Sequence, residues 1–174
     1  MLYAFNKPYG VLCQFSGEGD TLANYINTKN IYPAGRLDKD SEGLLLLTDD
    51  GQLQHKISHP KFDKEKTYVV QVDGEINTHA LEQLRAGITL KDGLTKPAKA
   101  RLINEPDWLW DRVPAVRFRK NCPTSWIELI ITEGKNRQVR RMTAQVGFPT
   151  LRLIRTQIGH WILSDIKLGQ YERL

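Results

Sequence analysis

The amino-acid sequence predicts an α+β protein whose mostly antiparallel, mixed sheet is flanked by helices. Short apolar segments with the character of strands outnumber the segments with helical spacing. These strands are not separated by the regular helical crossovers that a doubly wound parallel sheet requires. The chain has 174 residues. That length is enough for one domain, or for two closely packed subdomains, with a substantial core.

The first part of the chain contains two predicted strands and two predicted helical segments. A short apolar strand is expected at Leu2–Asn6, closed by the turn at Lys7–Gly10. Thr21 can cap a short helix, because its hydroxyl can accept a bond from a backbone N–H in the first turn. Leu44–Thr48 is a continuous apolar run and therefore a buried strand, and Gln52–Ile57 is expected to be helical.

The second part repeats this mixture of strands and helices. Thr67–Val72 is rich in β-branched and aromatic residues and predicts a strand. A helix begins at Thr78, because Leu81, Leu84 and Ile88 follow with helical spacing. Further strands are expected at 88–90 and after the turn at 91–93, at 126–132, at 150–158 and at 161–163, with a helix at 136–146.

The distribution of charge favours an anionic partner. Lys and Arg number 25 against 20 Asp and Glu, which gives a net charge of +5. The basic residues concentrate in two stretches, Arg112–Lys120 and Lys135–Arg141. Two local basic surfaces on a nearly balanced chain make nucleic acid the leading candidate, with an ordinary solvated surface as the alternative.

Other features bear on the surroundings of the protein. No segment has the run of apolar residues that a membrane span needs, and Met1–Pro8 lacks the pattern of a signal peptide. Cys13 and Cys122 are too few for a disulfide framework or a metal cluster. We therefore expect a cytoplasmic protein with reduced thiols and no membrane contact. Nothing in the pattern indicates a dimer, so a monomer is expected.

The segment from Asn104 to Ser125 has poor periodicity. It places Trp108 and Trp110 beside several arginines and prolines. Aromatic rings stack on bases while guanidinium groups bind phosphates, so this composition suits contact with nucleic acid. Tryptophans that close over the core are an equally good interpretation.

The densest chemical signature surrounds Asp38. The run Arg36-Leu37-Asp38 supplies a guanidinium, an apolar anchor and a carboxylate, and it leads into Leu44–Leu47. This order is typical of a reactive loop that precedes a buried strand, because a rigid core holds such a loop in place.

A second signature lies in the predicted helix at 136–146. Val139 and Met142 mark its apolar face, while Arg137, Arg140 and Arg141 form a basic ridge on the opposite face. Such a ridge can hold phosphates or pair with a carboxylate, and a nearby arginine would keep an aspartate in a dry pocket ionised.

Several kinds of site are disfavoured. His55 and His59 have the spacing of helical zinc ligands, but no glutamate lies between them. There is no glycine-rich phosphate loop, no dinucleotide fingerprint and no hydrolase nucleophile elbow. We expect no metal site.

Four ordered motifs resemble those of one enzyme family. They are Asn6–Val11, Gly35–Asp38 with the Leu47–Gly51 stretch behind it, Lys66–Tyr68 and Glu133–Met142. Together they resemble the motifs of pseudouridine synthases, and more narrowly those of the RsuA branch, which acts on ribosomal RNA. Two further stretches, at 123–126 and 147–152, are similar to a large-subunit subgroup of that branch.

The resemblance implies the pseudouridine synthase fold, with two subdomains around a catalytic cleft, formed by residues 1–62 and 63–174. Many members of the branch carry an N-terminal RNA-binding domain resembling ribosomal protein S4, and we expect that domain to be absent here. RNA affinity would then come from the catalytic domain itself. The expected RNA-binding residues are Lys7, Arg112, Arg117, Arg119, Lys120, Lys135, Arg137 and Arg141.

The resemblance also implies the roles of individual residues. Asp38 would be the catalytic carboxylate and Arg140 its ion-pair partner, whereas the residues alone leave Tyr68 as an ordinary core residue. By resemblance, Tyr68 would stack on the target base and Arg36 would help to fill the place of an extruded nucleotide. The implied substrate is a uridine of 23S ribosomal RNA, as naked RNA or as an assembly intermediate, and no cofactor is required.

The chemistry agrees with this assignment. A uridine in folded RNA must leave its stack before its glycosidic bond can be broken. The sequence leaves open whether Asp38 attacks the sugar, adds to the base or removes a sugar proton. Two other hypotheses remain: an RNA-binding assembly factor without turnover, and a glycosidase or nucleosidase that releases free base.

Overall fold

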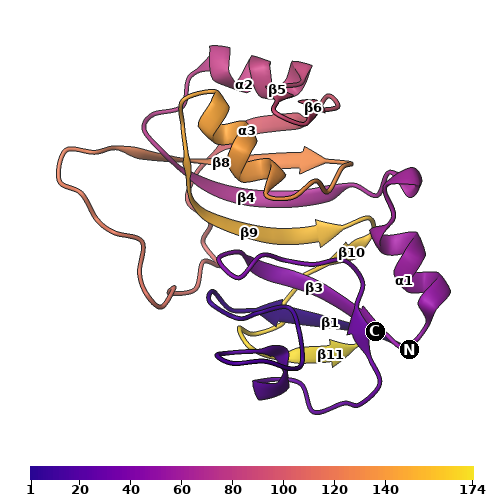
Figure 1. The fold of residues 1–174 in the computed structure, drawn as a ribbon. Helices are drawn as coiled ribbons and strands as arrows, with labels where there is room; N and C mark the ends of the chain where they lie inside the picture. Colours follow the sequence, from indigo (N-terminus) through magenta and orange to yellow (C-terminus); the bar gives the residue numbers. More distant parts are fainter. The chain divides into compact units, whose positions relative to one another are not determined.

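The structure, a computed structural model, describes residues 1–174 and divides into two compact units. The first unit comprises Met1–Lys64 together with Ile154–Leu174, and the second comprises Glu65–Leu153. The first unit is discontinuous in sequence because the C-terminal segment returns to the N-terminal strand. The amide of Leu174 donates to the carbonyl of Leu2 (2.8 Å), and the two termini lie near each other in Figure 1.

The sheet of the first unit is built around two central strands, β1 (Leu2–Lys7) and β3 (Glu42–Thr48), which pair antiparallel. On its other edge β1 pairs antiparallel with β11 (Tyr171–Arg173). β3 pairs in parallel with the later half of β9 (Thr150–Ile158), with Glu42 opposite Ile154 and Gly43 opposite Arg155. The two short strands are β2 (Tyr32–Pro33), on β3, and β10 (Trp161–Ile162), on β9.

The core of this unit forms where the sequence predicts a buried strand, since all seven residues of β3 are buried. Thr21 caps the 3₁₀ helix Leu22–Asn24, as expected. Asp50 caps α1 (Gly51–Ser58) by accepting from two backbone amides, and the 3₁₀ helix Pro60–Phe62 follows. The main core cluster contains Phe5, Val11, Leu22, Ile26, Ile31, Leu37, Leu45 and Leu47.

The second unit contains a three-stranded antiparallel sheet in the order β4 (Lys66–Asp73), β8 (Thr124–Ile131) and β7 (Lys99–Ile103). Its helices are α2 (Thr78–Ala86) and α3 (Gln138–Gln145), and its small hairpin consists of β5 (Thr89–Leu90) and β6 (Gly93–Leu94). Figure 1 shows α2, α3 and the hairpin as neighbours.

The predicted α+β class, with mostly antiparallel strands and flanking helices, is confirmed, but three elements differ from the sequence prediction. β7 was not predicted: it is a short edge strand in which only Ala100 is buried, so it lacks the run of large apolar residues that marks the other strands. α2 ends at Ala86, so Ile88 lies beyond the helix although it still joins the core. α3 begins only at Gln138, because Arg137 has a left-handed backbone (φ 52°).

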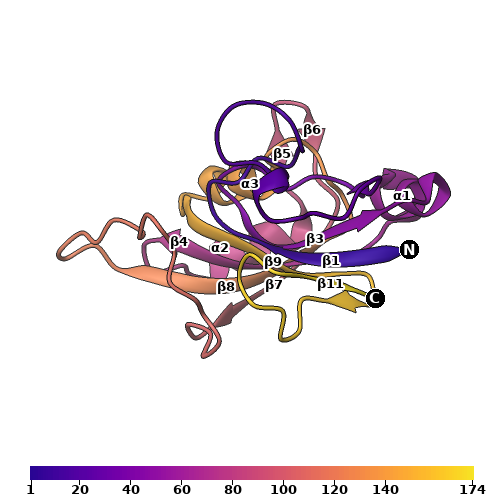
Figure 2. The ribbon, with the colours of Figure 1, turned by 90° about the horizontal axis from the view of Figure 1, so that it is seen from below.

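The connection between β7 and β8, residues 104–123, contains no helix or strand. Figures 1 and 2 both show it running far out beyond the ends of the two strands that it joins. None of the helices is long and apolar enough to span a membrane.

Candidate active site

The loop before β3 presents Asp38 at the end of a well-anchored segment. Leu37 is buried in the core cluster of the first unit, while Arg36 is exposed and Asp38 is half-buried. The carbonyl of Asp38 accepts from the amide of Ser41 (3.0 Å), which closes a turn immediately before β3. The sequence therefore predicted the local arrangement correctly: an apolar anchor holds a carboxylate at the rim of a buried strand.

Lys7 supports this loop from β1. Its side chain is completely buried, and its ammonium donates to the carbonyls of Pro8 (2.9 Å), Val11 (2.8 Å) and Lys39 (3.3 Å). The sequence analysis assigned Lys7 to RNA binding. That assignment is wrong for this conformation, because an enclosed ammonium bonded to three carbonyls cannot reach a phosphate.

Burial also changes the protonation of this lysine. Desolvation lowers the pKa of Lys7 from 10.5 to about 8, and the charges of Cys13, Glu42, Asp40 and Asp38 oppose this shift. The charged form is thus less favoured in the folded protein than in the unfolded chain.

Replacing Lys7 with Met should therefore reveal a rise of stability with pH in the wild type. Below pH 8 Lys7 is protonated in both states, so its contribution is constant. Between pH 8 and 10.5 only the unfolded chain keeps the proton, and the wild type should gain up to about 3 kcal/mol relative to Lys7→Met. Urea unfolding of both proteins from pH 7 to 10.5 measures this difference, and a flat difference would contradict the shift.

Cys13 is a half-buried group that contacts the same loop. Its thiol accepts from the amide of Leu37 (3.4 Å), and burial raises its pKa. A thiol that burial keeps protonated is a poor nucleophile, so Cys13 is a packing residue beneath the loop and not a reactive one.

Tyr68 belongs to the second unit. It lies early in β4, opposite Leu129, and only 8% of its surface is exposed. The same apolar cluster contains Val139 and Met142 of α3, so the core holds the tyrosine and the helix that carries Arg140 together. The interpretation of Tyr68 as a core residue is confirmed by its burial.

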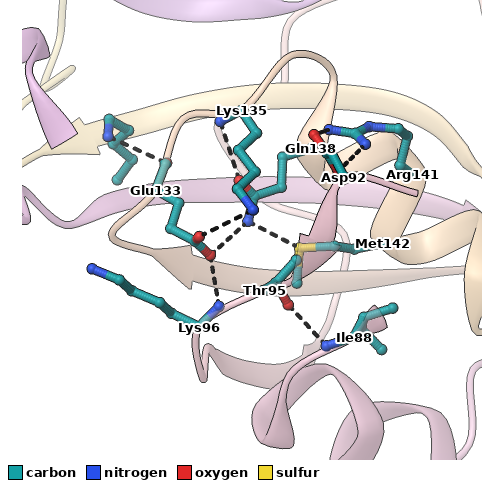
Figure 3. A network of polar contacts seen from close by, with 10 residues as sticks. Ile88, Asp92, Thr95, Lys96, Glu133, Lys135, Gln138, Arg141 and Met142 are labelled. Atoms are coloured by element: carbon teal, nitrogen blue, oxygen red, sulfur yellow. Dashed lines mark hydrogen bonds and ion pairs between the residues drawn. The ribbon is translucent and has the colours of Figure 1, made fainter. Parts of the chain in front are cut away.

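The motif at 133–142 is fixed by a polar network, shown in Figure 3. Glu133 is its centre, since its carboxylate accepts from the amide of Lys96 (2.7 Å) and from the side chain of Gln138 (3.1 Å). Gln138 in turn accepts from the amide of Lys135 (3.2 Å) and donates to the sulfur of Met142 (3.6 Å). These bonds fix the start of α3, and hence the position of Arg140 two residues further along.

The basic residues of this motif do not form one ridge on a helix. Arg137 lies before α3 in a left-handed conformation, so only Arg140 and Arg141 are helical. Arg141 makes a bidentate pair with Asp92 of the hairpin (2.7 and 3.2 Å), and Lys135 lies 3.9 Å from Glu133. The guanidinium of Arg141 thus ties α3 to the β5–β6 hairpin.

The segment 104–123 forms an open cavity of about 600 Å³ near its base, lined in part by Trp110, Trp126 and Arg152. Arg152 donates to the carbonyl of Trp110 (2.8 Å), and Arg112 donates to the carbonyl of Leu151 (3.2 Å). These two arginines therefore hold the base of the segment in place.

The outer part of the same segment is very exposed. Phe118 is 89% exposed and is flanked by Arg117, Arg119 and Lys120, which are exposed too. Arg119 forms an ion pair with Asp73 (2.8 Å). Of the two interpretations of this segment, closure of its tryptophans over the core is wrong for Trp108, which is 48% exposed, while Trp110 is half-buried.

The predicted site residues are divided between the units. Asp38 and Arg36 share one loop of the first unit, and all the others except Lys7 lie in the second. Arg155, Gln138 and Phe118 were not among the predicted site residues. Arg155 had a detectable signal, because a charged residue inside a predicted apolar strand is seldom buried without a specific partner.

Comparison with known proteins identifies the family. Residues 1–145 match the model of the family described as RNA pseudouridylate synthase. Because this match covers most of the chain, the protein belongs to that family of enzymes, and the resemblance of its four motifs is confirmed.

The chain is also similar to individual members of this family. The chain is 55% identical over 172 residues to ribosomal large subunit pseudouridine synthase E of Vibrio parahaemolyticus, covering 98% of this chain and 72% of the relative. It is 53% identical over 175 residues to the protein of the same name from Xanthomonas campestris, covering 98% and 94%. A solved structure titled as a pseudouridylate synthase has 32% identity and a TM-score of 0.82, covering 99% of this chain and 69% of that one.

Proposed function

We propose that this protein isomerises a uridine of 23S ribosomal RNA to pseudouridine. The observation that carries the proposal is the identity of 53–55%, over 98% of the chain, with relatives named as large subunit synthases. The anchored loop around Asp38 and the fixed start of α3 support it, because they hold in place the two groups that the chemistry needs. Ribosomal RNA as substrate implies that the enzyme works in the bacterial cytoplasm.

In the proposed reaction the target uridine first leaves the RNA stack. The N1–C1′ bond then breaks, the detached base rotates, and C5 joins C1′; N1 gains a proton and C5 loses one. No redox change occurs. Asp38 supplies the carboxylate that acts on the flipped nucleoside, and Arg140 is its proposed ion-pair partner.

The detached base must be held while it rotates, and we assign this role to Tyr68. An aromatic face holds a base by stacking and still lets it turn in its own plane. The assignment rests on the resemblance of the Lys66–Tyr68 motif, and the packing of Tyr68 in the apolar cluster of the second unit fixes its ring in place. Arg36, exposed in the Asp38 loop, is suited to enter the space that the flipped nucleotide leaves.

A map of pseudouridine in ribosomal RNA tests the function. Carbodiimide-based mapping should show the loss of one site in 23S RNA from a strain that lacks the gene, and its return on complementation. An unchanged map with a defect in subunit assembly would instead indicate an assembly factor. Release of free uracil by the purified protein would indicate a nucleosidase.

We further propose that the exposed tip of the segment 104–123 contacts the RNA. Phe118 provides a ring for stacking, and Arg117 and Lys120 provide charges for phosphates. The proposed RNA contacts of the second unit are then Arg112, Arg117, Arg119, Lys120, Lys135, Arg137 and Arg141. Three of them also form ion pairs within the protein: Arg119 with Asp73, Lys135 with Glu133 and Arg141 with Asp92.

Replacing both Arg117 and Lys120 with Ala should weaken RNA binding about tenfold and reduce the slope of log K against log salt by about 1 to 2. RNA releases bound counterions when the protein contacts its phosphates. A variant with fewer phosphate contacts releases fewer counterions on binding, so its slope is shallower. Filter binding between 50 and 300 mM salt measures both quantities. The control is Lys29→Ala with Lys167→Ala, which removes the same charge from exposed positions of the first unit. Equal slopes for the two double variants would refute the RNA contact.

A further inference from the structure

Arg155 is a buried cation that the proposed chemistry does not use. It lies on β9 with only 3% of its surface exposed. In the sheet register it is opposite Gly43, and Gly43 is opposite Lys7 on the other side of β3. Two buried cations therefore flank the residue at which the Asp38 loop enters its strand.

The guanidinium of Arg155 contacts both ends of the Asp38 loop. Its Nε donates to the carbonyl of Leu44 (2.9 Å), and its Nη1 donates to the carbonyl of Arg36 (3.4 Å). One of these carbonyls precedes Asp38 and the other follows it. Because the donors of a guanidinium have a fixed planar geometry, this bridge sets the distance between the two ends of the loop.

Lys7 completes the support from the opposite strand, where its ammonium reaches the carbonyl of Lys39 at the turn. The carbonyls of Arg36, Lys39 and Leu44 are thus all held by buried cations of the neighbouring strands. A loop held at both ends and at its turn has little freedom to displace Asp38.

Stability alone is a poor reason for a buried arginine here. The Nη2 atom of Arg155 is buried and has no hydrogen-bond partner. A buried donor without a partner destabilises the fold, and apolar residues often replace buried charges without loss of stability. Buried polar groups that destabilise a fold often occur where the residue serves function.

We propose that Arg155 is a positioning residue of the reaction: by bridging Arg36 and Leu44 it sets the place of the Asp38 carboxylate. The inference rests on the proposed role of Asp38. Misplacement of a reacting group by about 1 Å costs roughly a hundredfold in rate.

Arg155→Lys is the informative variant, because lysine keeps the charge but cannot bridge two carbonyls with a rigid fork. We expect the single-turnover rate of pseudouridine formation to fall about 10- to 100-fold, with the Kd for RNA within about threefold of the wild type. Hydrogen exchange should also accelerate in peptides covering 36–44, and not elsewhere in the first unit.

The control is Arg85→Lys on α2. Arg85 also donates to a backbone carbonyl, that of Ala100 (2.8 Å), so the substitution removes a guanidinium–carbonyl bond of the same kind from the second unit. Its single-turnover rate should stay near that of the wild type, and exchange at 36–44 should not change.

The two proposals fail differently. If wild-type protein forms no pseudouridine, the proposed function is wrong, and the exchange measurement still tests the bridge. Unchanged exchange at 36–44 in Arg155→Lys overturns the inference whatever the activity. So does a normal single-turnover rate, or an equal loss of rate in Arg155→Lys and Arg85→Lys.

Discussion

Asp38→Asn is expected to abolish pseudouridine formation while leaving the fold and most of the RNA binding intact. Asparagine has nearly the shape of aspartate, so the half-buried position and the turn to Ser41, which uses the backbone of residue 38, should persist. Only the negative charge is lost. Because the proposed reaction needs that carboxylate at the nucleoside, the loss of rate should be at least about 10⁴-fold.

The release of tritium from RNA that contains 5-³H-uridine measures this effect, since C5 loses its hydrogen when it joins C1′. Asp40→Asn is the matched control. It removes the same charge two residues along the same loop, and it should retain a rate within a fewfold of the wild type. Thermal unfolding and RNA binding of both variants check the fold. Substantial turnover by Asp38→Asn would exclude Asp38 as the catalytic carboxylate.

The elements nearest to the site could be predicted because their signals are local. Leu44–Leu47 are four consecutive apolar residues, which is typical of a strand buried on both faces, and β3 is buried throughout. Leu37 could be recognised as an anchor because it stands between two charged residues before that strand. Pattern and resemblance agreed at this loop, which is why Asp38 stood out.

The contacts that fix the site were not predictable in this way, because they join residues far apart in sequence. Lys7 follows an apolar strand and precedes a proline, a context that indicates an exposed turn. Its burial depends on the carbonyl of Lys39, which is 32 residues away. The pairing of Arg141 with Asp92 likewise spans 49 residues. Helical spacing predicts on which face of the helix Arg141 lies, but it cannot predict that Asp92 is its ion-pair partner.

The start of α3 illustrates another limit. Residues 136–146 have helical periodicity, yet Arg137 adopts a left-handed conformation and the helix begins one residue later. The side chain of Gln138 accepts from the amide of Lys135 and so closes the turn before the helix. Periodicity predicts which residues share a helix face. It does not predict that a side-chain oxygen, here that of Gln138, accepts the hydrogen bond of a backbone amide in place of a carbonyl.

Gly43→Ala should be strongly destabilising, because Gly43 lies directly against the backbone of β9. Its φ is +100°, which residues with a Cβ rarely adopt, and an added Cβ would lie 2.2 Å from the carbonyl oxygen of Arg155. That atom belongs to the backbone of the paired strand, so it cannot turn aside as a flexible side chain could. We expect a loss of at least about 3 kcal/mol, which corresponds to a fall in Tm of roughly 6 to 12 °C.

Two other glycines separate the effect of the positive φ from that of the steric contact. Gly147 also has a positive φ (+91°) but has no atom within 4 Å of an added Cβ, so Gly147→Ala should cost only the backbone strain of about 1 to 2 kcal/mol. Gly51 is free of both constraints at the start of α1, so Gly51→Ala should be neutral or slightly stabilising. The excess loss in Gly43→Ala over Gly147→Ala then measures the close approach of the strands. Equal stability of the Gly43 and Gly147 variants would refute the close approach. Because an added Cβ at Gly43 would displace β9 and so pull Arg155 from Arg36 and Leu44, the folded fraction of Gly43→Ala should also have a lower single-turnover rate.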